Sequence, residues 1–125
     1  MLHVSSASIC GRILLAYGLT FVIGFERELR GSPAVDRTFS LIGLGSAIVA
    51  LLALANAPQA LAGVVTGVGF IGAGVVVRQT TQVGDRIQGV TTAATIFATA
   101  AIGAAAGQAA YAAAILATAL VLITL

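Results

Sequence analysis

The residues of this chain that could do chemistry are few, and almost all of them fall in two short segments. Every arginine, aspartate and glutamate except Arg12 lies within residues 26–37 or 78–86. Magnesium is bound in proteins by one or two carboxylates together with water. The sequence therefore offers four candidate magnesium ligands: Glu26, Glu28, Asp36 and Asp85.

Glu26 is the acid with the most unusual position. It follows Gly24 by two residues, at the expected edge of a long apolar stretch, where a carboxylate costs energy unless it is paired or faces the protein interior. Arg30 is four residues on and would pair with Glu26 weakly on a helix. Stronger partners are expected in Arg37 and Arg78.

Six charged residues form one expected polar cluster: Glu26, Arg27, Glu28, Arg30, Arg37 and Arg78. In one interpretation, the cluster is a set of interfacial salt bridges that fixes the topology. In the other, it binds a cation or a partner protein, and Glu26 is the candidate metal ligand.

The uncharged stretches between these segments must position the cluster, and they are typical of membrane spans. Hydrophobic residues make up 59% of the 125 residues and charged residues only 8%, against about 25% charged in a soluble domain. We expect an all-α, polytopic membrane protein: one transmembrane domain over residues 1–125, with helices at about 9–25, 38–57, 59–77, 90–106 and 110–125.

The arginines also predict an orientation. With five spans, loops 26–37 and 78–89 lie on the same side of the membrane, and both are arginine-bearing. Arginine-rich short loops stay in the cytoplasm. The N-terminus is therefore expected outside and the C-terminus inside. Arg12 is the exception, and we expect it to reach the outer interface by snorkelling.

The third expected helix is unusually rich in glycine, at Gly63, Gly67, Gly69, Gly72 and Gly74. Small residues let membrane helices approach closely, so this helix is expected to pack against the alanine-rich fourth helix. The alternative is a polar pathway along exposed carbonyls. Thr91 and Thr92 open the fourth helix, where one of them can cap it. Thr95 and Thr99 are expected to bond back to carbonyls or across helices.

Other functional classes find little support in the sequence. The chain has one cysteine, Cys10, and one histidine, so it lacks the residues for a catalytic triad or a metal cluster built on these side chains. No basic stripe with interleaved aromatic residues is present, so no nucleic-acid binding is expected. We predict that the protein is not an enzyme and needs no cofactor, with magnesium as the one candidate ligand.

Three motifs together resemble the MgtC/SapB family of bacterial inner-membrane proteins. They are Gly24-Phe25-Glu26-Arg27-Glu28-Leu29-Arg30-Gly31 with Arg37-Thr38, then residues 67–74, then residues 89–95. They occur in the family's order and extend over essentially the whole chain. The chain departs from the family at Val35 and Asp36, where glycine and leucine are frequent, and at Phe97, where tryptophan is frequent.

The resemblance implies five spans in the inner (plasma) membrane, contact with membrane lipid, and a link to growth or virulence at low magnesium. Some family members are thought to bind other membrane proteins, including the F-type ATP synthase. Many also have a soluble C-terminal domain, which these residues do not include. We therefore expect a regulator that binds membrane proteins, with a magnesium or small-cation conduit or a purely structural module as alternatives. We also expect a homo-oligomer, a dimer above all, because the glycine faces can serve between chains.

Overall fold

The computed structural model describes residues 4–32, 34, 36–82 and 84–125, and it consists of helices with one β-hairpin. The elements are α1 (Ser6–Leu29), α2 (Asp36–Ala53), α3 (Ala60–Val75), β1 (Val77–Thr81), β2 (Gly84–Gln88), α4 (Val90–Gly107) and α5 (Tyr111–Thr124). The expectation of five helices is confirmed.

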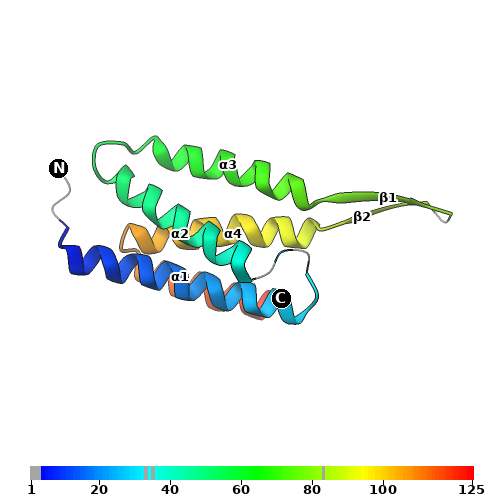
Figure 1. The fold of residues 1–125 in the computed structure, drawn as a ribbon, viewed down its shortest axis with the longest axis horizontal. Coiled ribbons are helices and arrows are strands. Elements are labelled where there is room, and N and C mark those ends of the chain that lie inside the picture. The colour runs from blue at the N-terminus through cyan, green and yellow to red at the C-terminus, as the bar shows by residue number, and fades with distance from the viewer. Residues whose placement is uncertain (1–3, 33, 35, 83) are drawn as a thin grey trace.

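The helices run up and down, roughly antiparallel, and α4 contacts each of the other four (Figure 1). The connection from α1 to α2, the hairpin and the end of α5 lie at one end of the bundle. The α2–α3 and α4–α5 turns lie at the other end. The two arginine-bearing loops are therefore at the same end of the molecule, which we call the charged end.

Helix α1 is longer than the expected 9–25. It begins after Ser5, whose hydroxyl accepts a hydrogen bond from the Ser8 amide, and it continues through the charged run to Leu29. Gly31 follows with a φ of 70°, a conformation that glycine adopts without strain and that ends the helix. Three of the clustered charged residues, Glu26, Arg27 and Glu28, thus lie on the last turn of a helix rather than in a loop, and Arg30 is its C-cap.

The segment between α3 and α4 differs from the expected polar loop. The strands β1 and β2 form an antiparallel hairpin in which Val77 pairs with Gln88 and Thr81 with Gly84. Figure 1 shows the hairpin extending beyond the ends of the helices. Gly89 joins it to α4 with a φ of 88°, and a side chain there would meet the carbonyl oxygen of Val75. Glycine is therefore required where the hairpin returns to the bundle.

The tightest packing is among α1, α2 and α4. A Cβ atom at Gly43 of α2 would collide with Thr20 of α1, and one at Gly103 of α4 would lie 2.5 Å from the Gly43 carbonyl oxygen. A Cβ at Gly107 would lie 2.5 Å from the oxygen of Ala47. Glycine at these positions lets three helix backbones approach closely, which stabilises a bundle in lipid.

Three helices, α1, α2 and α4, are long and apolar enough to cross a membrane. The apolar helices α3 and α5 have 16 and 14 residues, or about 24 and 21 Å at 1.5 Å per residue, against about 30 Å for a hydrocarbon core. The outer surface is strongly apolar, with Leu14, Phe70 and Ile123 each at least 70% exposed. Such a surface suits lipid.

Candidate functional site

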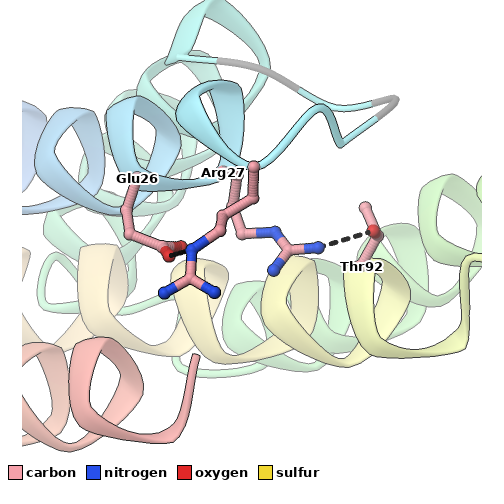
Figure 2. Close-up of polar contacts among 4 residues, drawn as sticks. Glu26, Arg27 and Thr92 are labelled. Atoms are coloured by element: carbon pink, nitrogen blue, oxygen red, sulfur yellow. Dashed lines mark hydrogen bonds and ion pairs between the residues drawn. The ribbon is translucent and has the colours of Figure 1, made fainter.

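The candidate site lies at the charged end, where the last turns of α1 meet the first turn of α4. Helix α1 supplies Glu26 and Arg27, α4 supplies Thr92, and the α1–α2 connection supplies Ser32. In Figure 2 the side chains of Glu26 and Arg27 leave α1 in the direction of α4.

The carboxylate of Glu26 is buried, although its residue lies near the end of the helix. Its side chain is 20% exposed, and both carboxylate oxygens are shielded from solvent. Arg30 Nε lies 3.0 Å from Glu26 Oε1, which makes an ion pair across one helical turn. Among the described residues, Oε2 has no hydrogen-bond partner. The site therefore contains a carboxylate that is shielded from solvent and has a cationic partner at only one of its two oxygens.

Arg27 reaches from α1 to α4. Its Nη2 atom donates to the Thr92 hydroxyl at 3.4 Å, and the Ser32 and Thr92 hydroxyls lie 3.2 Å apart. Thr92 is 3% exposed. The expected capping of α4 by a threonine is wrong, because the N-cap is Gly89 and no side chain caps the helix. Thr92 instead joins three segments of the chain at one buried point.

The other members of the expected cluster lie at its periphery. Glu28 and Arg37 are exposed, and the Arg37 amide donates to Asp36 Oδ1 at 2.7 Å. In the described part of the chain Glu26 forms its ion pair with Arg30, so the expected pairing with Arg37 is not found. The side chain of Arg78 lies outside the described residues.

The α3 glycines are placed differently from the expectation. Only Gly72 is near α4, with a Cβ position 3.6 Å from Ala93. At Gly63, Gly67, Gly69 and Gly74 no atom lies within 4 Å of that position. Within one chain, the expected close packing of α3 on α4 through these glycines is therefore limited to Gly72.

Arg12 has a role at the opposite end that the sequence did not reveal. Its Nη1 atom donates to the carbonyl oxygen of Gly107 at 3.1 Å, at the C-terminus of α4. A cation is stabilised there, because the last carbonyls of a helix carry partial negative charge. The contact joins α1 to α4 at the end of the bundle where the outer interface is expected, and the snorkelling of Arg12 stays a prediction.

The hydroxyl groups of the threonines inside the bundle donate hydrogen bonds to backbone carbonyls of their own helix. Thr95 donates to the Thr91 carbonyl and Thr99 to the Thr95 carbonyl, each at 2.7 Å. The expected back-bonding is confirmed. Over the described residues, no group of three or more histidine, cysteine, aspartate or glutamate residues is arranged to hold a metal ion.

Together, the apolar outer surface, the glycine-packed helices and the charges at one end define a small helical membrane protein. Residues 13–125 match the family model described as the MgtC family, so the chain belongs to the MgtC family.

Relatives in several bacteria support this assignment. The chain is 39% identical to protein SrpB of Synechococcus elongatus, over 91% of this chain and 71% of that protein. It is 42% identical to Escherichia coli YhiD, named as a proposed magnesium transporter, over 74% of this chain and 47% of YhiD. It is 35% identical to protein MgtC of Salmonella typhimurium, over 88% of this chain and 48% of MgtC.

The chain thus spans about half the length of YhiD and MgtC. No solved structure matches it.

Proposed function

We propose that the chain is a multi-pass protein of the bacterial inner membrane that supports growth when magnesium is scarce. In this proposal it is a regulator that acts by binding other membrane proteins, and not an enzyme. Membership of the MgtC family supports the proposal, as does the magnesium-related name of YhiD.

The observation that most favours a regulator is the filled centre of the bundle. Ile23, Phe39, Ile96 and Ile102 are fully or almost fully buried there. The Thr20 hydroxyl is also buried and donates back to its own helix at 2.7 Å. Magnesium keeps several of its waters when it binds, so a path for it would have to be wide and polar. Tight apolar packing favours a role in which the protein moves no ion through its own centre.

The charged end provides a surface suited to partner binding. Arg30 is 65% exposed, and Glu28 and Arg37 are also exposed. Half-buried Arg27 holds the end of α1 in place through its contact with Thr92 of α4, and half-buried Glu26 pairs with Arg30 at the same end of α1. Exposed charges on a fixed helix end favour specific electrostatic recognition. Integral membrane proteins such as the F-type ATP synthase are the class of partner proposed.

The alternative is a magnesium or small-cation conduit, and one observation favours it. Glu26 has a shielded carboxylate whose Oε2 lacks a partner among the described residues. A desolvated carboxylate near a membrane boundary is a frequent feature of ion pathways. In this alternative, Glu26 lies at the cytoplasmic mouth.

Two measurements on the same protein distinguish the proposals. The first is growth at low magnesium of a strain that depends on this protein. We expect Arg37→Glu to abolish growth and Arg37→Lys, which keeps the charge, to preserve it. Both variants should insert in the membrane in normal amounts. Normal growth of the Arg37→Glu strain would contradict binding through this surface.

The second measurement is magnesium flux into proteoliposomes that contain the purified protein and a trapped indicator. A regulator should give no flux above that of protein-free liposomes. Saturable flux that is lost in Glu26→Gln would overturn the regulator proposal and support the conduit.

A further inference from the structure

A groove between α2 and α3 remains open on the outer surface of the bundle. It has a volume of about 400 Å³, and its lining includes Leu41, Gly45, Ser46, Gly63, Gly67 and Ile71. Apart from Ser46, these side chains are apolar or absent. The groove therefore faces the region that lipid or another protein would occupy.

Ser46 is the polar group in this groove. It is 5% exposed, yet its hydroxyl makes no hydrogen bond within the part of the chain that the structure describes. Ser40, six residues earlier on the same helix, donates back to the Asp36 carbonyl at 2.7 Å. Ser46 is ten residues from the start of α2, or about 15 Å along it, near the middle of a hydrocarbon core of about 30 Å.

One face of α3 beside the groove is also without partners in the chain. Gly63, Thr66, Gly67, Phe70 and Gly74 recur at the spacing of a single helix face. All five are exposed, and Phe70 is 85% exposed. No atom lies within 4 Å of a Cβ position at any of the three glycines. The backbone of this face is therefore accessible to another helix.

We propose that a second copy of this chain docks here, with α3 of each copy lying in the α2–α3 groove of the other. Lipid tails at this depth offer Ser46 no acceptor, whereas a glycine-rich helix offers backbone carbonyls and the Thr66 hydroxyl. Gly63 and Gly67 allow the two α3 helices to approach closely. A two-fold axis uses the same surface on both copies and closes the assembly as a dimer.

This inference does not depend on the proposed function, because it uses no residue of the charged end. A regulator and a conduit could each be dimeric. The interface lies on α2 and α3, away from α1, where the single cysteine of the chain, Cys10, is exposed. Cys10 is thus a natural site for a fluorescent label that leaves the interface unmodified.

The test is energy transfer between donor-labelled and acceptor-labelled copies in liposomes, measured as lipid dilutes the protein. Wild-type protein should show saturable transfer. Gly67→Leu should weaken the dimer at least about tenfold, because the added side chain separates the helices. Gly69→Leu is the matched control: Gly69 is equally open but does not line the groove.

A second pair of variants tests the hydroxyl. Ser46→Ala should weaken the dimer about eightfold, because a two-fold dimer loses two hydrogen bonds between membrane helices, each contributing a little under threefold on average. Ser40→Ala should leave the dimer unchanged, because its hydroxyl bonds within its own helix. Circular dichroism of each variant checks that the fold is retained.

Three outcomes would overturn the proposal. Wild-type protein that is monomeric at every dilution would leave the groove to lipid or to a different protein. Equal transfer in Gly67→Leu and Gly69→Leu would place any dimer interface elsewhere. Undiminished transfer in Ser46→Ala would show that the hydroxyl has no acceptor in a second copy.

Discussion

At the scale of single residues, consecutive charges at the end of α1 have different environments. Glu26 and Arg30 are one turn apart and meet as an ion pair, whereas Arg27, about 100° around the helix, points to Thr92. Glu28 is exposed. Helix geometry therefore separates one charged run into two anchored residues and an outward-facing set that can contact a partner.

The Glu26–Arg30 pair should add little to stability. Arg30 is 65% exposed, and ion pairs with an exposed partner contribute about 1 kcal/mol or less. We predict that Glu26→Gln lowers the free energy of unfolding by about that amount, measured by denaturant titration in detergent micelles. A loss of several kcal/mol would show instead that Glu26 is a structural residue, and a growth defect in this variant could then result from misfolding.

Arg12 should contribute more to stability than Glu26. Its guanidinium donates to a carbonyl at the end of α4, and hydrogen bonds to charged groups contribute about 1.5–3 kcal/mol. We predict that Arg12→Met lowers the free energy of unfolding by about 2 kcal/mol in the same titration. Arg12→Lys, which keeps the charge, should lose less. Equal stability of wild type and Arg12→Met would contradict the capping role.

At the scale of elements, α1, α2 and α4 are packed closely through glycines on α2 and α4 rather than on α3. A Cβ at Gly43 would collide with Thr20, whereas one at Gly18 of α1 would have no atom within 4 Å. We predict that Gly43→Ala lowers the free energy of unfolding by about 1–3 kcal/mol. Gly18→Ala should be neutral or slightly stabilising, because alanine favours helix. Equal effects of the two changes would contradict the packing.

The sequence predicted the helices well and their contacts poorly. Apolar length between the two charged segments, together with turn residues at 56–58 and 107–108, was enough to place five helices. It did not distinguish Gly43, whose Cβ position would meet Thr20, from Gly67, whose Cβ position has no atom of another described element within 4 Å. A glycine leaves no sequence pattern that identifies its neighbour. The hairpin was also missed. Its strands carry polar residues with no clear alternation, and it forms where the ends of α3 and α4 bring them together.

The same limit applies to the candidate site. The position of Glu26 near a span boundary predicted that its charge needs a partner, and the i,i+4 spacing identified Arg30 as one candidate. The contact of Arg27 with Thr92 joins residues 65 positions apart, so no local pattern could predict it. The contact of Arg12 with Gly107 was likewise not predicted, because its acceptor is a backbone carbonyl, which a sequence does not distinguish from any other.

At the scale of the whole molecule, the fold places five of the six arginines at one end. The exception is Arg12, whose charge is used at the C-terminus of α4. Since arginine-rich short loops are retained in the cytoplasm, the charged end should lie inside the cell and the α2–α3 turn outside. The hairpin then extends into the cytoplasm, beyond the helix ends (Figure 1).

Cysteine labelling tests this orientation directly. In a Cys10→Ser background, we predict that Gln59→Cys, exposed at the α2–α3 turn, reacts with a membrane-impermeant maleimide in intact spheroplasts. Gln82→Cys, exposed in the hairpin, should react only after the membrane is permeabilised. The reverse pattern would place the charged end outside. The exposed charges of Glu28, Arg30 and Arg37 would then face the periplasm, and partners would have to be sought on that side.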